Sequence, residues 1–403
     1  MKKRPKPRSD KKRKSGLRLD KRAALASYYG FTSREVKPIP TENLFKLKKM
    51  LALDSKKDSE IMMAFDTAVN LDEKLILINE FVSRGENPFQ PVMVFYYKHK
   101  NEHKSSKYVN CGLEIIGTTK SIAEVTLIKT SLELLKNEGY KNLTIDINSI
   151  GDKDSLVRLI RELTNYYRKH ISDLPAPCRH LLKKDVFEVL LYPDEKCLLL
   201  REDAPKPMNY LSELSQQHFR EVLEFLERMD IPYQIISSLV GNKKYVNHVV
   251  FEIRCGEAGD PKSEILARGF RYNGIAKKIG SRKEIPAVGV ALSFKAQPLH
   301  HGNRKISMKK CKVYFIQLGF EAKSKSLKVI ETLSKEKIPL QQSLSKDKLS
   351  AQLSAAEHMK IPYVLIMGQK EAMEDSVIVR NMTTRSQNTV SIRELSAYLK
   401  KLI

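Results

Sequence analysis

Apolar residues follow two different spacings along this chain, one typical of strands and one typical of helices. Short runs rich in β-branched and aromatic residues predict strands over Tyr245–Ile253 and Pro286–Phe294. A break rich in Gly, Asp and Pro at 256–261 lies between them and turns the chain back, which favours antiparallel pairing. Apolar residues recur at helical spacing over 121–138 and 217–229, so helices are expected to accompany the strands.

The last part of the chain has a more regular alternation of strands and helices. Polar and basic residues at 300–310 form a predicted linker. Beyond it, the runs VYFIQL, PYVLIMG and SVIVRNM predict strands, and helical spacing predicts helices over 322–335, 346–360 and 391–402. Strands that alternate with helices of this length favour a small α/β domain with a mainly parallel sheet over 311–403.

The charge of the chain indicates what kind of partner it binds. Lys and Arg outnumber Asp and Glu by 72 to 47, which gives a net charge of +25. An excess of this size favours a polyanionic partner such as RNA, although a basic surface that only aids solubility would also produce it. Residues 1–22 concentrate this charge and have almost no apolar side chain, so they are expected to form a disordered tail. The tail either contacts phosphates or only aids solubility. The basic residues assigned to phosphate contact there are Lys2, Lys3, Arg4, Lys11, Lys12, Arg13 and Lys14.

The spacing of cysteines, histidines and apolar residues narrows the classes of site and compartment. The five cysteines lie far apart with no C-x-x-C pair, which argues against a structural zinc site and for a reducing, cytoplasmic compartment. His300 and His301 have no Cys, Asp or Glu at ligand spacing, so no metal site is expected. No apolar run approaches the length of a membrane span, and no apolar stretch follows the first charges as it does in a secretory signal.

Several short motifs together resemble the histidyl-tRNA synthetase family. VVFEI at 249–253 is similar to the family's strand ending in V-F-E, and GFRYNGI at 269–275 is similar to its G-G-R-Y-D-G-L turn. LEIIG at 113–117 matches the end of its second motif, and NSIG at 148–151 matches a strand-to-turn segment. The stretches LSAQLSAAEHMKIPYVLIMGQKEA and VIVRNMTTRSQNTVSIREL resemble its anticodon-binding domain.

This resemblance implies a fold class and a division of the chain. It implies an α+β, class II synthetase-like domain with an antiparallel sheet at 23–299. After the linker at 300–310, it implies a small α/β anticodon-binding-like domain at 311–403 that contacts tRNA. The family's first motif builds a dimer interface, and the similar segment here is centred on Pro38, so the resemblance also implies a homodimer.

The motif residues that carry the family's chemistry are replaced in this sequence. At the positions of the arginines that bind ATP or the activated carboxylate stand Tyr96, Ala296 and Gly241. The acid of the family's L-R-P-E-G-T-A segment, which binds the substrate amino group, falls at Phe65. Losing one preorganised donor at a developing negative charge costs about 3–4 kcal/mol, roughly 10²–10³ in rate. Aminoacylation is therefore expected to be absent, and no catalytic residue is assigned.

The residues that remain imply a residual ligand pocket. Asp66 lies one residue after the position of the lost acid, Thr67 follows it, and Glu114 is kept in the second motif. Arg271 and Tyr272 belong to the glycine-rich turn. Three of these residues could instead have a purely structural role. Asp66 would then be a helix cap or a surface residue, Arg271 would form a salt bridge at a sheet edge, and Tyr272 would belong to the core.

Two basic loops are expected to contact RNA besides the tail. The polar loop between the two strands predicted within Pro91–Gly117 contains Lys98, Lys104 and Lys107. These lysines either contact a nucleic-acid backbone or form only a solvated hairpin tip. In the last domain, the loop after PYVLIMG offers Lys370.

Three functions are compatible with these residues. The first is a synthetase-like paralogue that binds tRNA or another structured RNA without aminoacylation, which follows from the lost arginines, the last domain and the charge. The second is a divergent active histidine–tRNA ligase, which would use ATP and Mg²⁺ and would need Arg254, Arg268 or Arg271 to replace the missing phosphate ligands. The third is a regulatory subunit that senses histidine or a nucleotide. Of these three functions, only the active ligase requires a cofactor.

Overall fold

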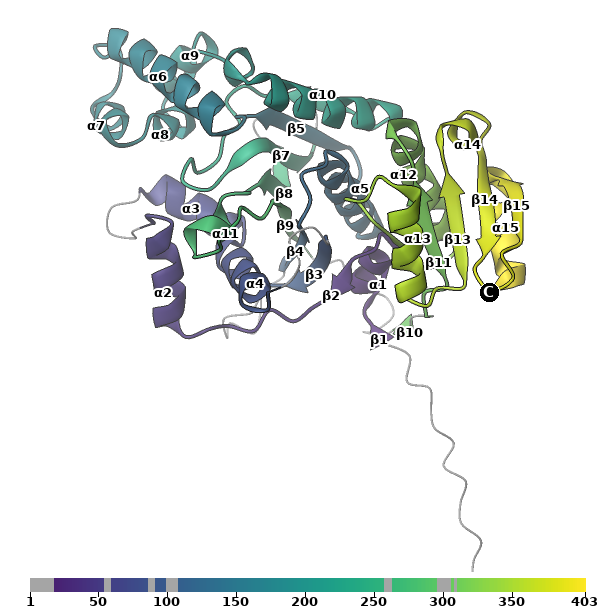
Figure 1. Cartoon of the computed structure of the whole chain (residues 1–403). Coiled ribbons are helices and arrows are strands. Elements are labelled where there is room, and N and C mark those ends of the chain that lie inside the picture. The colour runs from purple at the N-terminus through teal and green to yellow at the C-terminus, as the bar shows by residue number, and fades with distance from the viewer. Residues whose placement is uncertain are drawn as a thin grey trace, which may run out of the picture.

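The chain folds into a large domain around a wide sheet and a smaller C-terminal domain packed against one side of it (Figure 1). This computed structural model describes residues 18–53, 59–85, 91–98, 108–256, 263–295, 306–307 and 310–403. Within these residues, no helix is long and apolar enough to cross a membrane.

An eight-stranded mixed sheet forms the centre of the large domain. Its six inner strands pair antiparallel with one another, as the sequence predicted. The short edge strands β2 and β6 pair parallel with β3 and β5. The spatial order is β2 (Thr32–Ser33), β3 (Val92–Tyr97), β4 (Tyr108–Ile116), β9 (Ala287–Lys295), β8 (Glu264–Arg271), β7 (Asn247–Cys255), β5 (Leu143–Ser149) and β6 (Tyr233–Ile235).

The two faces of this sheet carry different layers of helices. On β9, Val288 and Val290 pack in one layer with α1, α5 and α10, whereas Ala287 packs in the other layer with α4 and α11. Side chains one residue apart on a strand thus reach opposite layers. The bounds of these and the adjoining helices are α1 (Lys21–Tyr28), α2 (Thr41–Met50), α3 (Glu60–Ala68), α4 (Leu71–Ser83), α5 (Ile122–Asn137), α10 (Glu213–Arg228) and α11 (Ile275–Lys278).

The region between β5 and β6 is mostly helical, and its last helix, α10, corresponds to the helix expected over 217–229. Asp152 caps α6 by accepting a hydrogen bond from the Ser155 amide at 2.9 Å. Cys178 and Cys197 pair as a disulfide between α7 and α9. The elements of this region before α10 are α6 (Lys153–Lys169), α7 (Ala176–Lys184), α8 (Val186–Leu191), α9 (Glu195–Glu202) and a short 3-10 helix, η1 (Pro207–Tyr210).

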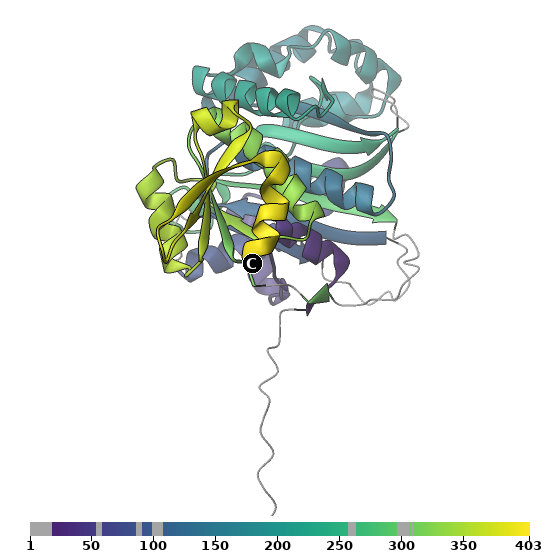
Figure 2. The same ribbon diagram turned by 90° about the vertical axis from the view of Figure 1, so that its right-hand side faces the viewer.

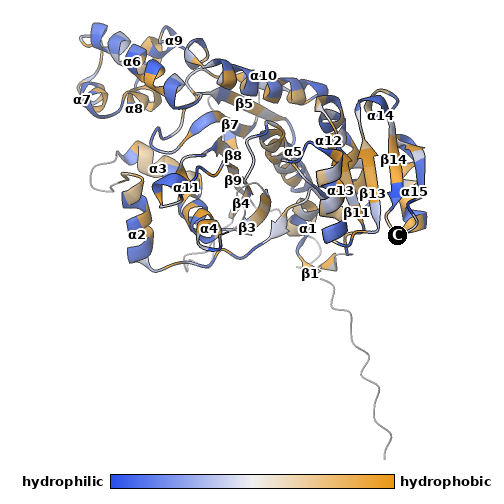
Figure 3. Ribbon diagram, viewed as in Figure 1, coloured by the Kyte–Doolittle hydropathy of each residue, from blue (hydrophilic) through white to orange (hydrophobic). Residues whose placement is uncertain are grey.

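The C-terminal domain is a five-stranded sheet with helices around it. Its central strands are strongly apolar and its helices present polar residues outward (Figure 3). The order is β12 (Leu340–Gln342), β11 (Val313–Gln317), β13 (Tyr363–Met367), β14 (Ser376–Asn381) and β15 (Gln387–Ser391). The helices are α12 (Phe320–Lys335), α13 (Leu349–His358), α14 (Gln369–Met373) and α15 (Ile392–Leu402).

The prediction of a mainly parallel sheet in this domain was wrong. β11 pairs parallel with β12 and β13, but β14 pairs antiparallel with β13 and with β15. The physical reason is connection length, since parallel neighbours need a long crossover. Only the one-turn helix α14 separates β13 from β14, and a short turn separates β14 from β15.

The end of the predicted tail and part of the predicted linker form one small element. Strand β1 (Arg18–Leu19) pairs antiparallel with β10 (Ile306–Ser307). Asp20 then caps α1, accepting from the Arg22 amide at 2.9 Å. Residues 1–17 lie outside the described residues, so their expected disorder stays a prediction.

The two domains contact each other through α5, α10 and α12. Figure 2 shows the C-terminal domain lying across one face of the large domain. The rings of Phe225 and Phe320 lie 4.4 Å apart between centroids, and Lys129 Nζ lies 2.6 Å from Glu331 Oε2. The apolar core is continuous across this contact, which fixes one domain against the other.

Candidate functional site

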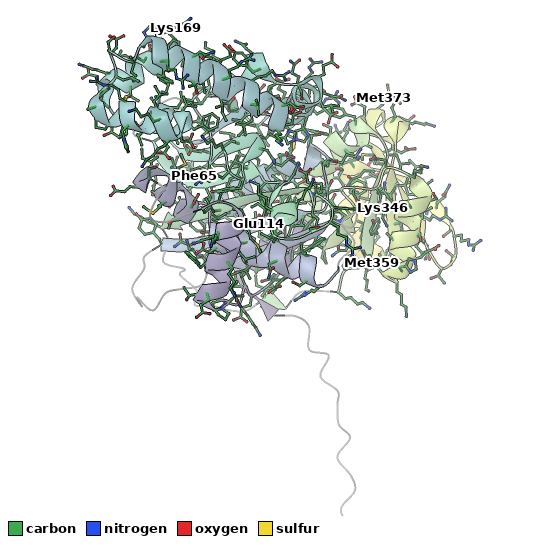
Figure 4. All side chains as sticks on the ribbon, turned by 60° about the vertical axis from the view of Figure 1, so that its left-hand side comes forward. Phe65, Glu114, Lys169, Lys346, Met359 and Met373 are labelled. Atoms are coloured by element: carbon green, nitrogen blue, oxygen red, sulfur yellow. A yellow bond between two sulfur atoms is a disulfide. The ribbon has the colours of Figure 1, made fainter. Side chains whose placement is uncertain are left out.

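Glu114 and Tyr272, both predicted pocket residues, meet in a closed cluster on the α4 side of the sheet. Lys74 Nζ lies 2.5 Å from Glu114 Oε1, and the Tyr96 hydroxyl donates to the same oxygen at 3.0 Å. The Tyr272 hydroxyl donates to Glu114 Oε2 at 2.5 Å. The side chains of Lys74 and Glu114 are both 0% exposed. Figure 4 shows Glu114 in the interior of the large domain.

Two glycines make room for this cluster. A Cβ at position 289 would lie 1.6 Å from Glu114 Oε2, and a Cβ at position 112 would lie 2.3 Å from the Tyr96 ring. Any side chain at either position would displace the cluster, so the close approach requires glycine.

Burial determines the protonation of the two tyrosine hydroxyls in the cluster. Burial, followed by the charge of Glu114, raises the pKa of both the Tyr96 and the Tyr272 hydroxyls well above their usual value, so both donate at neutral pH. Burial also raises the pKa of the Glu114 carboxyl, and the Lys74 ammonium and the two hydroxyls act against that shift. The Lys74 ammonium can only donate, and both hydroxyls donate to Glu114, which is the surrounding of a carboxylate.

Asp66 and Thr67 lie in a different place, at a cavity of about 340 Å³ between α2, α3 and α4. The Asp66 carboxylate accepts from the Tyr245 hydroxyl at 2.5 Å and from Asn242 Nδ2 at 3.2 Å. Lys98 Nζ donates to the Thr67 carbonyl at 3.0 Å. The cavity is lined by, among others, Leu44, Phe45, Met63, Asp66, Glu73 and Lys98. It combines apolar walls with a few charged groups, which is usual for small-molecule pockets.

The Phe270 ring packs near Tyr245, which donates to Asp66, and near Tyr272 of the Glu114 cluster. It lies 6.1 Å from the Phe65 ring and 5.6 Å from the Tyr245 ring, and the Tyr272 ring lies 5.7 Å away on the other side. The predicted pocket residues are therefore divided between an open cavity and a buried cluster.

Arg271 lies on the opposite face of the sheet from Tyr272. Its guanidinium forms two hydrogen bonds to the Glu124 carboxylate, both at 2.6 Å, and donates to the Thr118 carbonyl at 2.8 Å. Burial raises the pKa of Glu124, but the charges of Arg271 and His218 outweigh it and lower that pKa to about 2. Arg271 is salt-bridged, as its structural alternative stated, but on an inner strand and not at a sheet edge.

His248 lies beside this ion pair and makes the stability of the fold depend on pH. Burial, then the positive charges of His218 and Arg271, lowers the pKa of His248 to about 4, while Glu124 and Asp152 act in the opposite direction. A folded pKa below the unfolded value of about 6.5 contributes stability that is present above pH 6.5 and is lost as the pH falls to 4. Over that window, we expect this histidine to remove about 3 kcal/mol of unfolding free energy.

The matched variant for this prediction is His248→Asn, because the residue has a φ of 51° and asparagine tolerates that left-handed conformation. Urea unfolding at several pH values should show a smaller loss between pH 6.5 and 4 in the variant than in the parent chain. Equal slopes in the two proteins would contradict the assignment.

The RNA-contact residues are only partly described. Lys98 lies at the cavity, and the Lys370 side chain is 78% exposed on α14. Lys104, Lys107 and the seven tail residues, Lys2, Lys3, Arg4, Lys11, Lys12, Arg13 and Lys14, lie outside the described residues. Across the residues that the structure describes, no group of three or more His, Cys, Asp or Glu side chains could hold a metal ion.

Lys74 is the residue of this site that sequence reasoning did not single out. It lies in the run LDEKLILINEF, where Leu71, Leu75 and Ile78 form the buried stripe of α4. A lone lysine three residues after one of these leucines falls on the same side of a helix. That spacing indicates a lysine on the buried side of the helix, but it does not indicate which group pairs with it.

Comparison with known proteins identifies the family. The sequence model described as "Histidyl-tRNA synthetase" matches residues 92–296, about half of the 403-residue chain. The chain belongs to the histidyl-tRNA synthetase family. A second model, described as "Anticodon binding domain", matches residues 312–402.

Relatives within the histidyl-tRNA synthetase family cover most of the chain. A histidine–tRNA ligase of Anoxybacillus flavithermus is 28% identical over 326 residues, which span 79% of this chain and 77% of the relative. A histidine–tRNA ligase of Fervidobacterium nodosum is 31% identical over 303 residues, which span 73% of this chain and 70% of the relative. The crystal structure of the apo S. aureus histidyl-tRNA synthetase has a TM-score of 0.50 at 20% identity and covers 93% of both chains. The fold is therefore a class II catalytic domain with a large mixed sheet, followed by an α/β anticodon-binding domain, as the resemblance implied.

Proposed function

We propose that this member of the histidyl-tRNA synthetase family binds tRNA or another structured RNA and does not aminoacylate it. The observation that carries the proposal is the closed cluster around Glu114. Lys74, Tyr96 and Tyr272 already use the carboxylate that a residual pocket would offer to a ligand. A substrate could bind there only by displacing a fully buried ion pair.

Substituted motif positions support the absence of catalysis. Tyr96, which stands where the resemblance places an ATP-binding arginine, donates to Glu114. Phe65, at the position of the amino-group acid, packs against Phe270. At Gly241, where the resemblance places a further arginine, a Cβ would lie 2.7 Å from Val246 Cγ2, so a longer side chain would require the backbone to move.

The RNA part of the proposal rests on the C-terminal domain and on charge. The anticodon-binding match spans almost all of that domain, and the chain has a net charge of +25. Basic side chains such as Lys370 would contact the phosphate backbone, which fixes the position of the RNA, and the shape of the domain would supply selectivity. A homodimer and a cytoplasmic location are part of the proposal. The exposed Phe45 (57%) and Met50 (55%) of α2 favour a protein contact near Pro38, which sedimentation velocity can measure.

A divergent, active histidine–tRNA ligase is the second candidate. The relatives named above are histidine–tRNA ligases, and the cavity beside Asp66 has room for a small ligand. In that reading ATP and Mg²⁺ are required. Arg271 cannot supply a phosphate ligand without leaving Glu124, whereas Arg254 and Arg268 are more exposed.

Histidine-dependent ATP–pyrophosphate exchange, run beside a tRNA-binding titration, separates these functions. A histidine–tRNA ligase serves as the positive control, and omission of histidine gives the background. We expect tight tRNA binding and no exchange above background, because Lys74, Tyr96 and Tyr272 already occupy the Glu114 carboxylate. Exchange above background would establish the ligase instead. Absence of both would favour the regulatory subunit that senses histidine or a nucleotide.

A further inference from the structure

The Lys74 ammonium lies among groups that recognise amines. Besides the Glu114 carboxylate at 2.5 Å, Nζ lies 5.5 Å from the centroid of the Phe270 ring and 5.6 Å from that of the Tyr272 ring. A carboxylate together with aromatic faces forms a favourable surrounding for an organic cation. Two tyrosine hydroxyls also donate to Glu114, one to each oxygen, and hold the carboxylate in its orientation toward Nζ.

Stability alone does not explain why a charge is present at this position. On α4, Lys74 lies beside the buried apolar residues Leu71, Leu75 and Ile78. A buried ion pair is often no more stabilising than apolar residues of the same volume. A methionine at position 74 and an apolar residue at 114 would fill the same space. The presence of a lysine here therefore points to recognition of an ammonium.

We propose that Glu114, Tyr96, Tyr272 and Phe270 form an amine-binding site whose occupant in this chain is the Lys74 side chain itself. The lysine acts as a built-in ligand and closes the site to any free amine. The site takes an ammonium on an unbranched alkyl chain, since the lysine stem follows such a path from α4. It excludes neutral and anionic groups, because both leave the Glu114 carboxylate without a counter-charge in a fully buried place.

Replacement of Lys74 with alanine tests the proposal, because n-propylamine has the same heavy atoms as the part of the side chain that is removed. The variant leaves Glu114 buried without its cation, so its thermal midpoint should fall by roughly 5–15 °C. Added n-propylamine should raise that midpoint progressively with concentration, as expected for a ligand that binds only the folded chain. n-Propanol and propionate should not raise it, and the parent chain should not respond to the amine.

Two control variants show whether the effect belongs to this site. Lys74→Met fills the space without a charge and should not respond to n-propylamine. Lys129→Ala removes another lysine in a well-covered ion pair, with Glu331 at 2.6 Å and a side chain only 8% exposed. n-Propylamine should not raise the thermal midpoint of this variant either, because the carboxylate that loses its lysine is not enclosed. Equal restoration of all three variants, or restoration of Lys74→Ala by n-propanol, overturns the proposal.

If Lys74→Ala does not fold, the native chain provides a second measurement. Acylation by a lysine-reactive ester, followed by peptide mass spectrometry, should modify Lys48 on the neighbouring helix, whose side chain is 36% exposed. Lys74 should stay unmodified until the chain unfolds. Modification of Lys74 at the rate of Lys48 contradicts a closed, self-occupied site. These measurements follow stability and reactivity, so they are independent of the RNA titration.

Discussion

Replacing Arg271 with methionine is expected to lower the free energy of unfolding by about 3–5 kcal/mol. The side chains of Arg271 and Glu124 are 1% and 0% exposed, so the variant leaves a buried carboxylate without its main cation. The Thr118 carbonyl also loses its donor at 2.8 Å. Urea unfolding followed by tyrosine fluorescence measures the loss, since the chain has 16 tyrosines and no tryptophan.

Arg268→Met is the matched control, because this arginine lies on the same strand and pairs with Glu252 at 2.8 Å, but its side chain is 32% exposed. We expect it to cost no more than about 1 kcal/mol. Adding Glu124→Leu to Arg271→Met should recover part of the loss, since the unpaired charge is then removed. If Arg271→Met lowers the free energy of unfolding no more than Arg268→Met does, the ion pair between Arg271 and Glu124 does not hold α5 against the sheet.

Affinity for tRNA is expected to fall by roughly 10³–10⁵-fold between 50 and 200 mM salt, if the basic residues contact six to ten phosphates. The physical reason is the release of counterions from the RNA, which adds less free energy as the salt concentration rises. A filter-binding or fluorescence-anisotropy titration at several salt concentrations measures the slope. A flat response would contradict electrostatic binding and remove the main support for an RNA partner.

Deletion of the tail separates its part from that of the folded domains. The structure favours removing residues 1–17, because Asp20 caps α1 and Arg22 pairs with Glu138 at 2.8 Å. The removed segment contains nine basic residues, so the salt slope should become smaller. Selectivity for tRNA over an unrelated RNA should remain, since phosphate contacts in a tail do not read sequence or shape. Loss of selectivity would place recognition in the tail.

Much of the fold could be predicted from apolar spacing alone. The helix expected over 121–138 is α5 (Ile122–Asn137), and the strand expected over Pro286–Phe294 is β9 (Ala287–Lys295). Both have long apolar runs, and such runs are visible in the local sequence. The direction of β14 and β15 was missed, because pairing direction depends on how short connections bring strands together.

The candidate site was only partly predictable. Glu114 and Tyr272 do meet, although they are 158 residues apart in sequence. Arg271 was expected in the same pocket as Tyr272, but neighbouring residues of a strand point to opposite faces, and its partner is Glu124 of α5. Lys74 was missed, since an isolated lysine in a helix gives no indication of which carboxylate it will meet.

The sequence by itself determined the elements, the two-part organisation, the charge and the family, because each of these is written in local patterns or in short motifs. The tertiary structure alone decided that Lys74 fills the place beside Glu114 and that Asp66 lines a separate cavity. The physical reason is that ion pairing and close packing depend on distances of a few ångström between distant segments. Gly289 illustrates this dependence: its missing side chain leaves the space in which the Glu114 carboxylate lies.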